Sequence, residues 1–153
     1  MGSGQRHVDP HVSQSDAFTL ALERDPALRA TIVGITLLDR SPDWDRLVDR
    51  FDRATRAFPM FRECLVATPL GLAPPAWVPD EDFDLSWHLR RLRLADGAGM
   101  AELLDFARTA AMDAFDHDRP LWEFTLIEGL ADGRAALVLK VHHALTDGIG
   151  GVQ

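Results

Sequence analysis

One segment limits the possible folds more than any other. The run from Ala135 to Val141 is almost wholly apolar and leads directly into His142 and His143. A short apolar run of this kind is typical of a strand that is covered on both faces. A second strand-like run, Trp122 to Glu128, precedes it, and Asp132-Gly133 lies between the two. Because Asp-Gly favours a tight turn with two positive φ angles, the pattern predicts a hairpin whose second strand is central in a sheet.

The preceding residues predict a mixture of strands and helices. The β-branched segment Thr31–Leu38 is typical of a buried strand. Apolar residues at helical spacing predict two helices, and shorter apolar or alternating runs predict two more extended segments. The first predicted helix covers 41–58, capped by the Ser41 hydroxyl and ended by Pro59. The second covers 97–115, with Asp96 as a candidate cap. The extended segments cover 60–66 and 83–94. Without strict alternation, this order favours an α/β sandwich with a mixed sheet.

Size and composition exclude several classes of protein. A chain of 153 residues has the length of one domain. Its net charge of −8 argues against nucleic-acid binding, which usually requires an excess of basic residues. The single cysteine, Cys64, excludes an internal disulfide framework and is expected to be a buried, inert thiol. With only one cysteine, a reducing, cytoplasmic location is expected. No stretch approaches the ~20 apolar residues of a transmembrane helix.

The segment after the apolar strand carries the candidate chemistry. Histidine can accept and return a proton near neutral pH, and adjacent strand residues face opposite sides. One of His142 and His143 can therefore face a pocket while the other packs against the opposite layer. Asp147 could orient an imidazole or brace the loop, and Gly148 permits a tight turn. We expect no metal site here, because adjacent strand histidines diverge. Considered alone, such a histidine pair is more often structural than catalytic.

The motifs together resemble a known family. His142-His143-x-x-x-Asp147-Gly148 is similar to the HHxxxDG motif of CoA-dependent acyltransferases and condensation domains. Pro120-Leu121-Trp122 stands about twenty residues upstream, as in the bacterial wax ester synthase/acyl-CoA:diacylglycerol acyltransferase family. The opening segment 13–18, the strand 31–38 and the segment 58–62 also resemble that family. The resemblance extends from about Ser13 to Gly151.

The resemblance implies a fold and a set of residue roles. The fold would be one of two chloramphenicol-acetyltransferase-like halves, with the active site in a tunnel between them. His143 would be the general base that deprotonates a long-chain alcohol or diacylglycerol for attack on an acyl-CoA thioester. His142 would have either a packing or a supporting role. Asp147 and Gly148 would hold the motif loop, and Pro120, Leu121 and Trp122 would be structural.

The same resemblance implies partners and domain boundaries. We expect no cofactor, with acyl-CoA as co-substrate, and a C-terminal half in the same or a separate chain. Peripheral contact with the inner membrane or lipid inclusions is a further expectation. Residues 1–12 are expected to be a disordered N-terminus with a tag scar, and residues 13–153 the N-terminal acyltransferase subdomain. Two alternatives stay open: a condensation or polyketide-associated acyltransferase that uses carrier-protein thioesters, and an inactive half-domain that needs its C-terminal partner.

Overall fold

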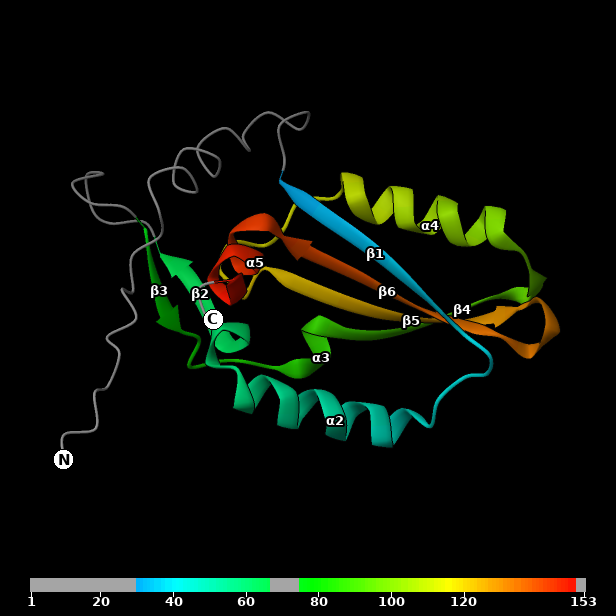
Figure 1. The fold of residues 1–153 in the computed structure, drawn as a ribbon, viewed down its shortest axis with the longest axis horizontal. Coiled ribbons are helices and arrows are strands. Elements are labelled where there is room, and N and C mark those ends of the chain that lie inside the picture. The colour runs from blue at the N-terminus through cyan, green and yellow to red at the C-terminus, as the bar shows by residue number, and fades with distance from the viewer. Residues whose placement is uncertain (1–29, 67–74, 151–153) are drawn as a thin grey trace.

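The structure is a computed structural model that describes residues 30–66 and 75–150, of which residues 147–150 are described by their backbone alone. The expectations for residues 1–12 and for the segment 13–18 lie outside the described residues. The described part contains a four-stranded sheet, helices on both of its faces, and a small two-stranded sheet (Figure 1). No helix in this part is long and apolar enough to cross a membrane.

The four-stranded sheet is mixed, as the sequence predicts. Its strand order is β1 (Thr31–Leu38), β6 (Ala135–His142), β5 (Trp122–Leu130) and β4 (Leu89–Ala98). Strand β6 is antiparallel to both of its neighbours, whereas β4 and β5 are parallel. The apolar run is therefore an interior strand, which confirms the prediction. Strand β1 matches the predicted segment along its whole length, but the expectation of a buried strand is wrong, because β1 lies at the edge of the sheet and its residues are half-buried or exposed.

The turn between β5 and β6 has the expected backbone conformation. A 3₁₀ turn over Ala131–Gly133 joins the two strands. Within it, Asp132 has φ 61° and Gly133 has φ 69°. Both central residues thus take the positive φ that made Asp-Gly a hairpin signal. This turn fixes the register in which Trp122 pairs with Val141 and Ile127 with Ala136.

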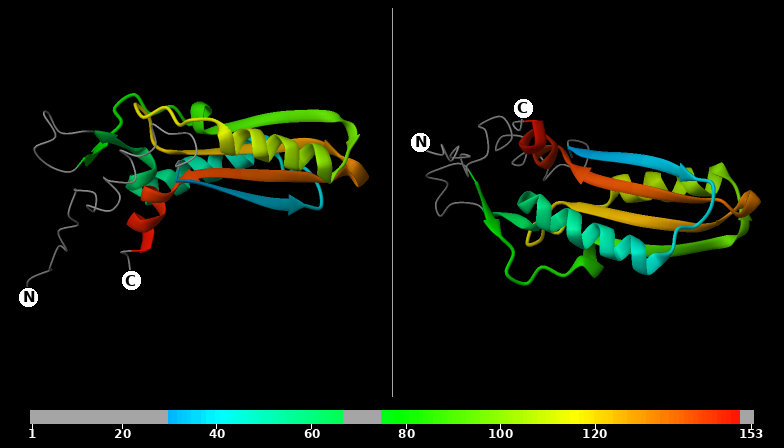
Figure 2. Two further views of the ribbon diagram at one scale, coloured as in Figure 1. Left: turned by 90° about the horizontal axis from the view of Figure 1, so that it is seen from above. Right: turned by 60° about the horizontal axis from the view of Figure 1, so that its bottom comes forward.

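Each face of the sheet packs against its own helix. Helix α4 (Met100–Met112) contributes Leu103 and Ala107 to a core with the sheet residues Ile127, Ala136 and Val138. Helix α2 (Trp44–Ala57) lies over the opposite face, where Phe51 packs among Trp122, Phe124, Leu139 and Val141 (Figures 1 and 2). Alternate residues of β5 and β6 therefore belong to different cores, as strand geometry requires.

The caps of both helices differ from the prediction. The N-cap of α2 is Asp43, whose carboxylate accepts from the Arg46 N–H at 2.9 Å. The Ser41 hydroxyl instead donates to Glu128 on β5. Helix α4 starts after Gly99, whose N–H donates to the Glu102 carboxylate. At the start of each helix, a carboxylate closer to the first turn than the predicted cap accepts the hydrogen bond: Asp43 rather than Ser41, and Glu102 rather than Asp96.

Two segments that were predicted to be extended contain helical turns. A 3₁₀ turn, Pro59–Arg62, precedes β2 (Glu63–Val66), which pairs with β3 (Ala76–Pro79) in the small sheet. Proline favours the first turn of a helix because its φ is already suitable and its missing N–H is not needed there. Helix α3 (Leu85–His88) occupies the start of the segment that was predicted to run extended from Phe83.

Candidate active site

The two histidines lie where strand β6 changes directly into helix α5 (His143–Gly150). His142 is 1% exposed, and its backbone N–H donates to the Leu121 carbonyl at 3.0 Å. Its ring nitrogen Nδ1 accepts from the Ala144 N–H at 3.0 Å. An accepting Nδ1 carries no proton, so this hydrogen bond selects one tautomer of the neutral ring. The His142 ring also meets the edge of Phe115, with 6.1 Å between the ring centroids.

His143 has the opposite environment, because its side chain is exposed. Its backbone is nevertheless held on both sides. The His143 N–H donates to the Ala30 carbonyl at 2.8 Å, and the His143 carbonyl accepts from the Thr146 hydroxyl at 2.7 Å. The adjacent histidines therefore diverge into a buried and an accessible position, as strand alternation predicts. The arrangement presents one imidazole to the surface on a backbone that is held by Ala30, just before β1, and by Thr146 in α5.

The residues after the histidines form a helix rather than a folded-back loop. Asp147 lies four positions after His143 within α5, so the two residues share one face of the helix. The side chains of Asp147 and Gly148 lie outside the described residues, so their predicted roles stay predictions. Within residues 30–66 and 75–146, no three His, Cys, Asp or Glu side chains are grouped as a metal ion would require.

The Pro120-Leu121-Trp122 segment contacts the histidine strand directly. All three residues are buried, and the Leu121 carbonyl accepts a hydrogen bond from the His142 N–H. Trp122 is 1% exposed, and its indole N–H donates to the Phe61 carbonyl at 2.8 Å. Hydrogen bonds therefore connect this segment both to the 3₁₀ turn at Phe61 and to the end of β6 at His142.

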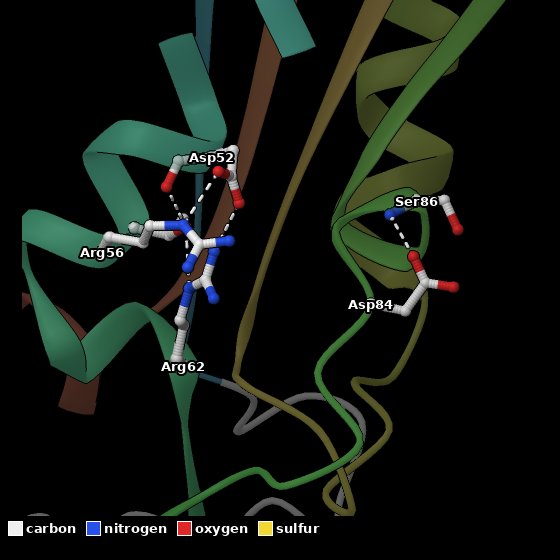
Figure 3. Close-up of polar contacts among 6 residues, drawn as sticks. Asp52, Arg56, Arg62, Asp84 and Ser86 are labelled. Atoms are coloured by element: carbon white, nitrogen blue, oxygen red, sulfur yellow. Dashed lines mark hydrogen bonds and ion pairs between the residues drawn. The ribbon is translucent and has the colours of Figure 1, made fainter. Parts of the chain in front are cut away.

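A charged cluster holds the turn that carries Phe61. The Asp52 carboxylate of α2 binds the Arg56 Nε at 2.9 Å and the Arg62 Nη2 at 2.7 Å (Figure 3). The Arg62 Nε also donates to the Thr55 hydroxyl at 3.0 Å. Hydrogen bonding to Arg56 is the main cause that lowers the pKa of Asp52, so the carboxylate is charged when it holds the turn. These ion pairs thus hold Arg62, the residue next to the Phe61 carbonyl that accepts from Trp122.

One buried residue of this region was missed by the sequence analysis. His88, at the end of α3, is 2% exposed and lies between the Phe83 and Trp122 rings, with centroid distances of 5.2 and 4.6 Å. The His88 Nδ1 and the Trp122 carbonyl are 2.8 Å apart. Burial lowers the pKa of His88, which favours the neutral ring. Its helical turn begins at Asp84, whose carboxylate accepts from the Ser86 N–H (Figure 3).

Comparison with known proteins now identifies the family. The family model for the wax ester synthase/diacylglycerol acyltransferase catalytic domain matches residues 12–153. The chain belongs to the wax ester synthase/diacylglycerol acyltransferase family. The resemblance inferred from the two motifs is therefore confirmed, and it covers the stretch of chain from which it was inferred.

Individual relatives agree with the family model. A Mycobacterium tuberculosis protein with the provisional name of diacylglycerol O-acyltransferase is 47% identical over 131 residues, which are 86% of this chain and 27% of that protein. The solved wax ester synthase/diacylglycerol acyltransferase of Marinobacter aquaeolei VT8 is 32% identical, with a TM-score of 0.74. This match covers 92% of the present chain and 36% of the Marinobacter chain. The chain thus spans about a quarter of the length of the mycobacterial relative.

More distant structures share only the fold. The first condensation domain of the CDA synthetase is 19% identical, with a TM-score of 0.66 over 90% of this chain and 35% of the other. This likeness confirms the prediction of a mixed-sheet half-domain of the kind found in the wax ester synthase/diacylglycerol acyltransferase family and in condensation domains.

Proposed function

We propose that this chain carries the general base of an O-acyltransferase, and that the base is His143. The reaction would move a fatty acyl group from acyl-CoA to a long-chain alcohol or diacylglycerol, forming a wax ester or triacylglycerol. The observation that carries the proposal is the exposed imidazole on a backbone held by Ala30 and Thr146. A general base must reach its substrate proton and yet keep a fixed position, and this residue meets both conditions.

The proposed step balances without a covalent enzyme intermediate. The alcohol gives its proton to the His143 imidazole while its oxygen attacks the carbonyl carbon of the thioester. The carbon–sulfur bond then breaks, and the imidazolium returns the proton to the leaving thiolate. General-base catalysis of this kind contributes about 10²–10⁴-fold, and alignment of the two substrates supplies much of the remaining acceleration. Acyl-CoA would be the co-substrate, with no further cofactor.

The neighbouring residues would position the base. His142 is buried, and its hydrogen bonds tie the end of β6 to Leu121, just before β5, and to Ala144 in α5. This supports a packing role for His142. Asp147 and Gly148 would hold the first turns of α5 in the conformation that the motif requires. A C-terminal half, in the same or a separate chain, would supply the opposite wall of the substrate tunnel.

The place of action follows from the proposed substrates. Long-chain alcohols and diacylglycerol partition into lipid, so the enzyme would work in the cytoplasm and make peripheral contact with the inner membrane or lipid inclusions. Substituting His143→Ala in the complete enzyme tests the base. We expect turnover with acyl-CoA and hexadecanol to fall at least about 100-fold with an unchanged thermal unfolding midpoint. The exposed His117→Ala serves as the matched control and should keep full activity.

Retained activity in the His143→Ala enzyme would refute the base assignment. Asp147→Ala should instead reduce the folded fraction more than the specific activity of the protein that remains folded. The shared fold of condensation domains keeps a second candidate, an acyltransferase that uses carrier-protein thioesters. Turnover of only acyl-carrier donors would replace the leading proposal with this one. Assaying residues 1–153 with and without a C-terminal half tests whether the segment needs that partner.

A further inference from the structure

One buried side chain outside the histidine motif has a polar atom that no neighbour pairs with. The His88 ring is 2% exposed and lies between the Phe83 and Trp122 rings. Its Nδ1 lies 2.8 Å from the Trp122 carbonyl oxygen, whereas its Nε2 has no hydrogen-bond partner among the described residues. Buried polar atoms are almost always paired, so an unpaired one indicates a position that a ligand or a water fills.

The protonation of the ring determines what such a ligand has to offer. Burial is the main cause that lowers the pKa of His88, so the ring is neutral. A carbonyl oxygen only accepts hydrogen bonds, so the single proton of the ring lies on Nδ1, which faces the Trp122 carbonyl. Nε2 is therefore an acceptor, and its partner has to be an N–H or O–H donor.

His88 lines a cavity of 390 Å³ at the end of the sheet where β4 and β5 begin. Aromatic rings cover both faces of the imidazole, and the Trp122 carbonyl covers Nδ1. The ring edge that carries Nε2 is thus the part left to face the cavity. The apolar part of the lining consists of Trp87, Ala114, Phe115, Pro120 and Trp122. The cavity therefore places a fixed acceptor beside an apolar wall.

The rest of the lining is charged, and its two signs balance. It contains three cations and three carboxylates: Arg90, Arg119 and Lys140 against Asp113, Asp116 and Glu123. The Glu123 carboxylate lies 3.5 Å from Arg90 and 3.9 Å from Lys140. Arg119 lies 3.3 Å from Asp116. These distances exceed the length of about 2.7–2.9 Å that is typical of a charge-assisted hydrogen bond, so Glu123 and Arg119 can still bind a ligand strongly.

This lining favours a ligand that carries both charges. A cation or an anion alone would add an uncompensated charge to a partly buried network, which is costly. An uncharged donor would pair with Nε2 but would leave the long ion pairs as they are. An ammonium has three donors, enough for His88 Nε2 and the Glu123 carboxylate together, and a carboxylate accepts from a guanidinium.

The groups that would bind the two charges lie close to one another. After burial, the charges of Glu123 and Arg119 are among the causes that shift the pKa of His88, so both groups lie near that ring. The Arg119 guanidinium also stacks on the Trp87 ring, 4.1 Å from its centroid. A cation that is held over the apolar wall can bind one end of a small ligand whose apolar part contacts the same wall.

We propose that this cavity binds a small zwitterion, an α-amino acid with an apolar side chain. Its ammonium would lie between His88 Nε2 and Glu123, and its carboxylate would lie on Arg119. Its side chain would contact the rings of Trp87 and Phe115. The site uses neither His143 nor an acyl group, so this proposal does not depend on the proposed function.

The first test compares three ligands that share the side chain of leucine. Leucine has both charges, isoamylamine lacks the carboxylate, and 4-methylpentanoate lacks the ammonium. Equilibrium dialysis of each radiolabelled ligand against the complete enzyme measures its dissociation constant. We expect one equivalent of leucine per chain, bound at least about tenfold more tightly than either of the other two, because each of these loses hydrogen bonds between charged groups. Leucine that binds no more tightly than either one would overturn the proposal.

Two variants assign the two ends of the ligand. Glu123→Gln should weaken the binding of leucine and isoamylamine about tenfold and leave that of 4-methylpentanoate unchanged. Arg119→Gln should weaken leucine and 4-methylpentanoate and leave isoamylamine unchanged. Arg93→Gln is the control, because Arg93 lies on β4 outside this cavity, and it should change none of the three. Substitutions that merely loosened the fold would weaken all three ligands alike, and that result would contradict the proposal.

Two substitutions at residue 88 test the acceptor. Asparagine can place an amide N–H near the position of Nδ1 but has no atom at that of Nε2, whereas the amide oxygen of glutamine can reach the latter. His88→Asn should therefore lower the affinity for leucine at least about tenfold, and His88→Gln should lower it less. Thermal melts identify a variant that fails to fold, in which case the Glu123 and Arg119 variants decide. Unchanged leucine affinity in folded His88→Asn would overturn the proposal, and so would wild-type enzyme that binds no leucine, since water alone would then pair with Nε2. Neither result would alter the turnover expected of His143→Ala.

Discussion

Replacement of Trp122 should cost more free energy of unfolding than any other single substitution in the described site. The indole is 1% exposed and donates to the Phe61 carbonyl at 2.8 Å. Truncating a buried tryptophan to alanine typically costs about 3–5 kcal/mol. Leaving the Phe61 carbonyl without its donor adds about 1–3 kcal/mol. We therefore expect Trp122→Ala to lose about 5 kcal/mol, enough to unfold a marginally stable protein.

Trp122→Phe separates a structural role from contact with substrate. Phenylalanine keeps much of the ring volume and loses the indole N–H, so we expect a loss of about 2 kcal/mol in urea unfolding. The specific activity of the folded fraction should stay near that of the wild type. Trp87→Phe is the matched control, because Trp87 is 50% exposed and should tolerate the change. An unchanged unfolding midpoint with lost activity in Trp122→Phe would refute the structural reading.

Three further predictions rest on single groups. Hydrogen bonding to Arg91 lowers the pKa of Glu128. The charged Glu128 therefore stabilises the fold at neutral pH, and this stabilisation declines as the pH falls below about 4.5. In thermal melts, the difference in stability between wild type and Glu128→Gln should narrow from pH 7 to pH 3. Gly129 has φ +89°, and an added Cβ would lie 2.5 Å from the Leu94 carbonyl oxygen. Gly129→Ala should therefore lower the free energy of unfolding by about 2 kcal/mol or more. Gly97→Ala, where the added Cβ would meet open space, should lower it by only about 1 kcal/mol. Burial raises the pKa of Cys64 to about 11, so iodoacetamide should alkylate the native thiol at pH 8 about 100-fold more slowly than the urea-unfolded one. Equal rates would contradict the buried position.

The sequence predicts the sheet better than the segments around it. The hairpin of β5 and β6 is predictable because a long apolar run and an Asp-Gly turn give two independent signals. Helix α3 is not, because four residues are too few to show a helical period. Phe83, Leu85 and Trp87 alternate as strand residues do, whereas the Asp84 cap that starts the turn is a weaker signal.

The candidate site shows the same limit. The spacing of His142, His143 and Asp147, taken together with Pro120-Leu121-Trp122 upstream, points to the family that the family model confirms. Alternation along the strand predicts that the two histidine rings diverge. The role of His88 could not be predicted, because its partners Phe83 and Trp122 reach it only through tertiary packing. The periodicity of apolar residues predicts which face of its own helix or strand a residue occupies. It does not predict which distant ring will pack against that face.

The hydrogen bond from His143 to Ala30 has a consequence for the order of events during synthesis. It joins residues near the two ends of the described chain, and β1 next to it pairs with β6. Strand β1 therefore has no partner in the main sheet while the intervening residues are made. Pairings between such distant segments form slowly, because the loop must close before any contact is gained. His143 would reach its fixed position only when β1 meets β6, which leaves the ribosome much later.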